Sequence, residues 1–483
     1  MADARTARSG ARTRPARVLI VALAAVTLAG AELLHRLGGL GEAAAIGRAA
    51  WILCAMLAAP LFGLREWAMG AAAGLLAAAL AFAAPDGVAG LVAALDLAAF
   101  FSAFILLMML LREAAATSRA IREVGYFMTH QPAGRRYVAT AVGAHLMGVL
   151  LNFGAISLFA PLVQQGVRAD PVETEADRRR LEIRERRQLT AMIRGFSWMI
   201  VWAPTTLTQA IVAAALPGLD HVRMMTLGLL ASASILLLGW AEDRWRWRAV
   251  MRRAAKVEGA PPPWRALGEL GTVCLCLIGA SYALMVAVGA GATQALMLVA
   301  PGVLVGWVFT QNLGRGPQAA AVAVGRRLDE IALGPLPTIA RDAVLLGAAG
   351  FIGAAAARLA PGPELAAWIA PGAVDPWLFL SALPVVILLA AQVALSPITT
   401  VVFLGGVLSN LSEPPAAPEL VGLALGAGWA LSMTGAPNAT GSIILSSMTG
   451  VPGPTLTWGW SGVFTLLSLT ALSAFFFIAT RLS

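Results

Sequence analysis

The sequence predicts an all-α polytopic membrane protein with about 11 transmembrane helices and two re-entrant hairpins, arranged as two inverted repeats. Three observations predict this fold class. The 483-residue chain is 59% hydrophobic and only 13% charged, whereas a soluble domain carries about 45–50% apolar and 25% charged residues. Apolar runs long enough to cross a bilayer recur along the whole chain. Arginines gather in particular segments between these runs. Soluble, fibrous and disordered classes are therefore excluded.

Composition also restricts the chemistry. In a soluble protein the net charge of +9 would suggest nucleic acid, but between membrane spans basic residues indicate orientation, so no nucleic-acid partner is expected. The Cys274-x-Cys276 pair has no nearby histidine or carboxylate to complete a metal site. The spans hold no aspartate pair, no metal-binding histidine pair and no phosphate loop with a lysine. We expect no metal, no cofactor and no enzymatic activity.

About 11 of the apolar runs are interpreted as membrane crossings. Residues 1–48 form a cytoplasmic tail and the first membrane helix, although the arginines before this helix and the small residues at its end also fit a cleavable signal peptide. The crossings are expected at about 18–34, 49–64, 68–84, 89–111, 195–216, 222–240, 270–289, 294–309, 339–360, 419–448 and 458–480.

The distribution of arginine predicts the first hairpin. Run 138–163 lies between 112–137 and 164–194, and both flanking segments are strongly basic. A single crossing would place one of them outside, so the run is predicted to enter and leave on the cytoplasmic side. Apolar residues at helical spacing over 178–194 further indicate an amphipathic helix on the inner leaflet. With this hairpin, five of the 35 basic residues lie outside: Arg36, Arg48, Arg223, Arg358 and Arg481.

Chain length and interruptions predict the second hairpin and the repeat. Run 376–411 is too long for one span and is broken by Pro384 and by Ser396-Pro397, so an extracellular re-entrant hairpin is expected. Each half also holds an interrupted helix, 195–216 with Pro204 and 419–448 with Pro437. The first repeat, 49–268, and the second, 269–483, thus share one order of elements. The odd number of crossings in each inverts the second, an arrangement typical of a secondary transporter with its site at the midplane.

Small polar side chains beside the breaks and hairpin tips are the candidate ligands of a solute or its ion. Irregular backbone survives in a bilayer only where it lines an enclosed or watery cavity. Such a break presents helix N-termini to an anion and free carbonyls to a cation. A proline kink whose backbone is bonded again by serine or threonine is the alternative. The candidates are Asn152, Ser157, Thr205, Thr206, Ser396, Thr399, Thr400, Thr434, Asn438 and Thr440.

Two ionisable residues inside apolar runs are candidates for carrying a coupling proton. His145 lies in the first hairpin, where a neutral, internally bonded histidine is the alternative. Asp96 lies in the middle of the fourth span, where it faces either a proton path or the arginine of a neighbouring helix.

The order of parts and three segments resemble the ion transporter superfamily, which includes divalent anion:sodium symporters, arsenite-type permeases and citrate–metal symporters. The resemblance implies an elevator-type carrier, often a homodimer, that moves an anion together with Na⁺ or H⁺. The Ser-Asn-Thr triplets of the dicarboxylate branch are absent from both hairpin tips. The similar segments are Leu151-Asn152-Phe153-Gly154-Ala155-Ile156, Ala394-Leu395-Ser396-Pro397-Ile398-Thr399-Thr400 and Ser432-Met433-Thr434-Gly435-Ala436-Pro437-Asn438-Ala439-Thr440.

These observations predict a permease of a bacterial inner membrane, with its N-terminus in the cytoplasm, that moves an anionic or small polar solute by secondary active transport. A channel-like pore and a non-transport scaffold of an envelope assembly are the alternatives. A pore needs a ring of like charges or a carbonyl filter, and a scaffold has no need of paired broken helices.

Overall fold

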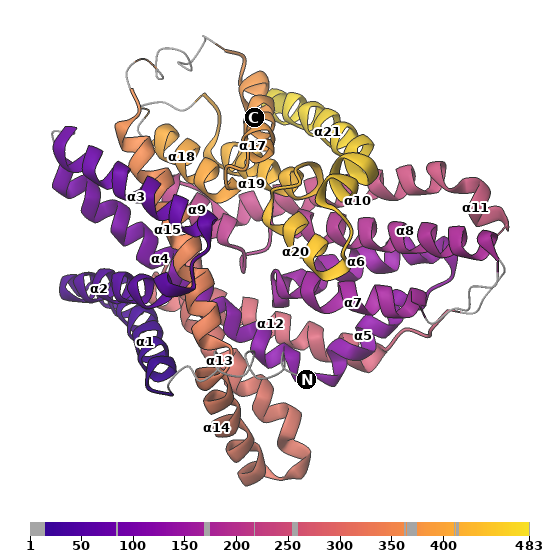
Figure 1. Ribbon diagram of the computed structural model, residues 1–483, viewed down its shortest axis with the longest axis horizontal. Coiled ribbons are helices and arrows are strands. Elements are labelled where there is room, and N and C mark those ends of the chain that lie inside the picture. The colour runs from indigo at the N-terminus through magenta and orange to yellow at the C-terminus, as the bar shows by residue number, and fades with distance from the viewer. Residues whose placement is uncertain are drawn as a thin grey trace, which may run out of the picture. The chain divides into compact units, whose positions relative to one another are not determined.

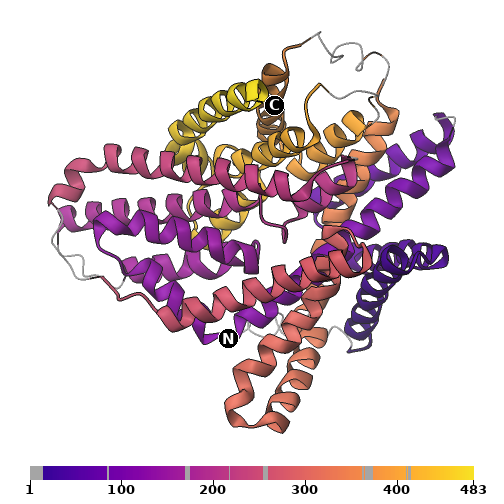
Figure 2. The same ribbon diagram turned by 180° about the vertical axis from the view of Figure 1, so that it is seen from behind.

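The computed structural model describes residues 15–83, 86–168, 174–216, 218–253, 259–361, 374–409 and 415–482, together with residues 364 and 411. Residues 1–14 of the predicted cytoplasmic tail and most of the segment 361–375, which precedes the second predicted hairpin, lie outside these residues. Helices are the only regular elements in the described part of the chain (Figures 1 and 2). The polypeptide divides into two compact units. Unit 1 comprises residues 1–114 and 284–355, and unit 2 comprises 115–283 and 356–483.

Ten helical segments in the described residues are long and apolar enough to cross a membrane. They coincide with ten of the predicted crossings. The remaining one, 195–216, is not among them, because its residues are divided between the end of a long polar helix and a helix of only 9 residues. The expected class, an all-α protein with many membrane-spanning helices, is therefore confirmed.

Unit 1 is organised around one apolar helix, α4, whose span is 67% buried, whereas that of α3 is 6% buried. Trp51 Nε1 donates to Ser102 Oγ, and this hydroxyl donates to the carbonyl of Ala343, both at 2.9 Å, which joins α2, α4 and α15. The elements are α1 (Pro15–Gly38), α2 (Gly41–Ala58), η1 (Ala59–Leu61), α3 (Leu64–Ala83), α4 (Gly87–Ala116), α13 (Ala292–Asn312), η2 (Leu313–Arg315), α14 (Pro317–Leu333) and α15 (Leu336–Leu359).

Unit 2 contains two series of helices that follow the same order. Helices α5 and α11, and most of α12, also belong to unit 2. The first part of the chain contributes α5 (Arg119–Thr129), α6 (Ala133–Leu151), α7 (Gly154–Arg168), α8 (Glu175–Met199), α9 (Leu207–Ala215), α10 (His221–Arg246), α11 (Arg248–Arg253) and α12 (Trp264–Val288). The second contributes α17 (Pro376–Gln392), α18 (Pro397–Ser409), α19 (Pro418–Gly435), α20 (Thr440–Thr449), the π-helical turn η3 (Thr455–Gly459) and α21 (Trp460–Leu482).

The two series, α6 to α10 and α17 to α21, also pack in the same way. In each, a pair of helices joined by a short tip precedes a long helix, a break, a short helix and a final helix. The first helix of each pair lies along the long helix of its own series, α6 on α8 and α17 on α19. The second packs on the short helix of the other series, α7 on α20 and α18 on α9 (Figure 1). The order of hairpin, interrupted helix and final helix thus recurs within unit 2, while the repeat bounds 49–268 and 269–483 stay a prediction.

The arginine-rich segment 178–194 differs from its prediction. It is not a separate amphipathic helix on a membrane surface but the first part of α8, which continues to Met199. Its last two turns are buried, Arg187 and Arg194 included. The apolar spacing in this segment therefore reflects packing inside the protein, because both guanidinium groups find buried carboxylate partners on α10.

Within unit 2, hydrogen bonds join helix ends that the predicted topology places on the same side of the membrane. On the predicted cytoplasmic side, Gln164 Nε2 donates to the Thr449 carbonyl at 2.9 Å and Arg186 Nη2 to that of Gly459 at 3.3 Å. On the predicted outer side, the Asp220 amide donates to Glu419 Oε1 at 3.2 Å. This grouping is the one expected if run 138–163 returns to its side of entry, which stays a prediction.

Labelling with a membrane-impermeant maleimide tests this topology. In a variant without native cysteines, Arg135→Cys and Arg179→Cys should each react only from the cytoplasmic side, because α6 and α7 return to it. Pro361→Cys, after α15, should react only from outside. Reaction of Arg179→Cys from outside would mean that run 138–163 crosses the membrane.

Candidate functional site

The first hairpin tip is bonded to the break between α8 and α9. Asn152 follows the last residue of α6 and adopts φ 49° and ψ −136°, a positive-φ conformation that ordinarily favours glycine. Its side-chain Nδ2 lies 3.5 Å from the Thr205 carbonyl, and Thr205 Oγ1 donates to the Val149 carbonyl at 2.7 Å. The tip and the break therefore hold each other in place.

Side chains beyond this break satisfy carbonyls left open before it. Pro204 lacks an amide hydrogen and cannot continue the helix. Thr206 Oγ1 donates to the carbonyls of Ile200 (3.2 Å) and Ala203 (2.9 Å), and Gln209 Nε2 donates to that of Val201 (2.8 Å). Because buried backbone polar groups need partners, these bonds allow an irregular segment to persist among apolar helices.

The second tip and break repeat this pattern with different residues. At this tip Ala394 has φ 65°, and it and Asn152 are the only non-glycine residues with positive φ in the described chain. Gln392 Nε2 donates to the Gly435 carbonyl at 2.9 Å, and Asn438 Nδ2 donates to the Gln392 carbonyl at 3.1 Å. Beyond the break, Ser442 Oγ donates to the Met433 carbonyl at 2.7 Å. Gln209 makes the corresponding bond to the Val201 carbonyl in the first series.

A glycine nine residues before each break proline aligns the two series. A Cβ on Gly195 would lie 2.0 Å from the Ala141 carbonyl oxygen of α6. A Cβ on Gly428 would lie 2.6 Å from Ile387 Cδ1 and 3.0 Å from Pro384 Cα of α17. Both glycines thus let the hairpin approach the interrupted helix closely. Sequence reasoning missed this signal, because it compared the halves by the order of their apolar runs and interruptions.

Not all of the other predicted site residues lie at a tip or a break. Thr206 lies beside Thr205 in the first break, whereas Ser157 lies in the first turn of α7. Ser396 precedes α18, Thr399 lies in its first turn, and Thr400 Oγ1 donates to the Ser396 carbonyl at 3.2 Å. Thr434 instead faces α21, with Oγ1 3.5 Å from Thr465 Oγ1. Thr440 begins α20 after the second break.

The electrostatics of the tips and breaks come from backbone and not from charged side chains. Segments 146–160, 200–216, 390–409 and 432–449 contain no Asp, Glu, Lys, Arg or His. The residues before α9 and α20, Thr206 and Ala439, give their helices no side-chain cap. Thr208 Oγ1, in the first turn of α9, is buried without a hydrogen-bond partner in the described structure. First-turn N–H groups carry the positive end of a helix dipole, so both breaks offer donors.

Buried ion pairs fix the helix that carries the first break. Arg187 pairs with Asp243 (2.7 Å) and Arg194 with Glu242 (2.8 Å), and all four side chains are at most 6% exposed. The two arginines lie seven residues apart on one face of α8, and both carboxylates belong to α10. At the rim of this cluster, burial and the nearby positive charge of Arg246 lower the pKa of Arg186. The pairs set the register of α8 against α10.

The two candidate proton carriers already have partners. The Gly195 carbonyl can only accept, so His145 Nδ1 donates to it at 2.9 Å, and Nε2 accepts the Trp202 indole N–H at 2.9 Å. These bonds join α6 to α8 and to the break that follows α8 through a neutral imidazole. Asp96, in unit 1, pairs at 2.5 Å with Arg48 of the neighbouring helix α2. Both contacts correspond to the alternatives that the sequence left open.

Comparison with known proteins identifies the fold. No protein-family model and no curated protein matches the chain. Among solved structures it is similar to the YdaH transporter of Alcanivorax borkumensis, whose crystal structure was described as having an unusual topology. The TM-score is 0.57 at 15% sequence identity, over 86% of this chain and 98% of that one. The protein is thus a multi-pass membrane protein with the fold of a membrane transporter, and a transporter fold agrees with the expectation of a non-enzyme.

The close approach of α6 to α8 is tested with two glycine variants. Alanine usually stabilises a helix interior relative to glycine by about 1 kcal/mol. Gly195→Ala should instead destabilise the purified protein by about 1–3 kcal/mol, because the added Cβ overlaps α6. Gly279→Ala in α12, where a Cβ meets nothing within 4 Å, is the control. The melting temperature in detergent should fall only for Gly195→Ala. Equal melting temperatures of the two variants would contradict the close packing of α6 on α8.

Proposed function

We propose that this protein is a secondary active transporter that moves an anionic or small polar solute across a bacterial inner membrane, with its N-terminus in the cytoplasm. One observation carries the proposal: in both series of unit 2, a hairpin tip is hydrogen-bonded to the break of an interrupted helix. Paired interruptions in repeated halves are how many secondary transporters build a solute site. The fold similarity to a transporter favours this function over a scaffold of an envelope assembly.

The chemistry of the breaks favours an anion over a cation as the solute. Side chains donate hydrogen bonds to the carbonyls before each break. The first turns of α9 and α20, by contrast, have no side-chain cap. Donors therefore exceed acceptors at the helix starts, and helix N-termini bind anions. The buried, unpartnered Thr208 hydroxyl adds a further donor beside α9. In this proposal Asn152, Thr205, Thr399 and Asn438 line one cavity with these helix starts.

Coupling to a cation and an elevator-type movement complete the proposal. Tip and break segments contain no carboxylate, so a coupling Na⁺ would be held by backbone carbonyls and hydroxyls, the hard oxygen ligands that such ions prefer. With H⁺ as the coupling ion, the solute itself would carry the proton. Unit 2 holds both tips and both breaks, so it would carry the solute as one body. A homodimer is the expected assembly.

Uptake by proteoliposomes tests the transport function. The purified chain should accumulate at least one member of a panel of organic and inorganic anions when a Na⁺ or an H⁺ gradient, imposed separately, is present. Collapse of the effective gradient should abolish accumulation. Failure to accumulate any anion under either gradient, with correctly inserted protein, would refute the proposal.

Alanine variants test the site. Asn152→Ala and Asn438→Ala each remove a bond between a tip and a break. The half-saturation concentration for the transported anion should therefore rise by roughly 2- to 13-fold, the equivalent of about 0.5–1.5 kcal/mol for one hydrogen bond. Ser234→Ala and Thr470→Ala are matched controls, because both hydroxyls are exposed and donate only within their own helices. Ser232 is unsuitable as a control, since its hydroxyl donates to the Trp198 carbonyl near the break. Wild-type kinetics of both asparagine variants would exclude this site.

A further inference from the structure

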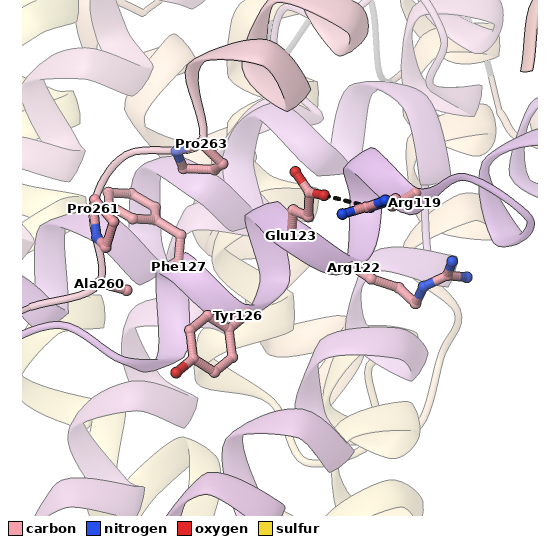
Figure 3. A pocket seen from close by; sticks show the side chains of 8 residues that line it. All are labelled: Arg119, Arg122, Glu123, Tyr126, Phe127, Ala260, Pro261 and Pro263. Atoms are coloured by element: carbon pink, nitrogen blue, oxygen red, sulfur yellow. Dashed lines mark hydrogen bonds and ion pairs between the residues drawn. The ribbon is translucent and has the colours of Figure 1, made fainter.

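A groove on unit 2 lies between α5 and the chain segment that leads into α12. Its volume is about 630 Å³, within the range of cavities that bind small molecules. Figure 3 shows the arginines at one end and the aromatic and proline side chains along the other. The lining residues are Arg119, Arg122, Glu123, Tyr126, Phe127, Ala260, Pro261 and Pro263. None of these residues belongs to the tips or breaks described above.

Both walls of the groove are held in place. Helix α5 buries one face, and a Cβ on Gly125 would lie 2.8 Å from Phe159 of α7, so α5 rests closely on that helix. The opposite wall is fixed by Gln131, whose Nε2 donates to the carbonyls of Phe127 (3.0 Å) and Ala260 (2.9 Å). The Ala260 amide also donates to the His130 carbonyl at 2.9 Å. The groove is therefore preformed.

The charge of the groove favours an anion. Arg119 Nε donates to Glu123 Oε1 at 2.7 Å, which neutralises one guanidinium. Arg122 makes no ion pair in the described structure, and Figure 3 shows its guanidinium turned away from Glu123. One positive charge is thus left in excess at the rim. A guanidinium offers several N–H donors in a planar array that matches the oxygens of a phosphate.

The surroundings of the groove match the boundary of a membrane. Pro263 is followed directly by Trp264, which begins the candidate span α12 and is 74% exposed. Tyr126 on the rim is 59% exposed. Tryptophan and tyrosine gather at membrane–water interfaces, where their rings lie at headgroup level. The predicted topology places this boundary on the cytoplasmic side, where the leaflet is anionic.

We propose that this groove binds the phosphate headgroup of an anionic phospholipid of the cytoplasmic leaflet. Arg122 and Arg119 contact the phosphate, and the glycerol and the start of the acyl chains lie along Phe127 and the prolines. A soluble phosphate would use the same guanidinium groups but would gain nothing from the apolar wall. The amphipathic lining therefore selects the lipid, and the site is separate from the proposed transport site.

Native mass spectrometry of the full-length protein, titrated with defined lipids, tests the proposal. Phosphatidylglycerol should bind saturably and more tightly than phosphatidylcholine. The double variant Arg119→Gln/Arg122→Gln should bind phosphatidylglycerol about 30-fold more weakly, as expected for two arginines near the surface of an anionic membrane. Arg122→Gln alone should weaken binding about fivefold. Both arginines are exposed, so the melting temperature should not change.

The double variant Arg178→Gln/Arg180→Gln is the control for charge, because it also removes two exposed arginines. It should leave phosphatidylglycerol binding unchanged. Equal binding of both lipids, or equal loss in both double variants, would overturn the proposal. Displacement of phosphatidylglycerol by inorganic phosphate at the same concentration would identify a site for a soluble anion and would also overturn it.

Discussion

The architecture of unit 2 depends on one constraint: peptide groups exposed where a helix stops among apolar side chains must find partners. Two helices stop in this way, before Pro204 and before Pro437. The open carbonyls need hydrogen-bond donors. Side chains of the same series supply them, Gln209 and Thr206 at the first break and Ser442 at the second. The hairpin tips exist in their observed positions because they supply the remaining contacts.

This solution leaves the breaks chemically asymmetric. Carbonyl oxygens receive side-chain donors, whereas the amide groups that begin α9 and α20 receive no side-chain acceptor. Helix α8, which precedes the first break, is also held against α10 by the ion pairs of Arg187 and Arg194. Buried ion pairs contribute little net stability, because desolvation offsets their attraction, but they do penalise any other register. The helix before the first break is thus held by groups that lie outside the break.

Much of the fold could be predicted from sequence, because lipid requires long apolar runs and the positive-inside rule orients them. The tips were placed correctly at Asn152 and near Ser396, since turns in a short hairpin need residues that tolerate them. Segment 178–194 was misread because Arg187 finds Asp243 56 residues away, and spacing along one helix carries no trace of such a partner. The same holds for His145, whose hydrogen-bond partners are Gly195 of α8 and Trp202 of the break after α8.

Reciprocal packing couples the movements of the two breaks. Helix α7 of the first hairpin rests on α20 of the second series, and α18 of the second hairpin rests on α9 of the first. A displacement of either tip would therefore disturb the short helix beyond the opposite break, as well as the bonds to its own. Independent opening of one hairpin would break contacts in both series. Concerted movement of unit 2 would leave them intact, so this packing favours the proposed elevator-type movement over a gate formed by one hairpin.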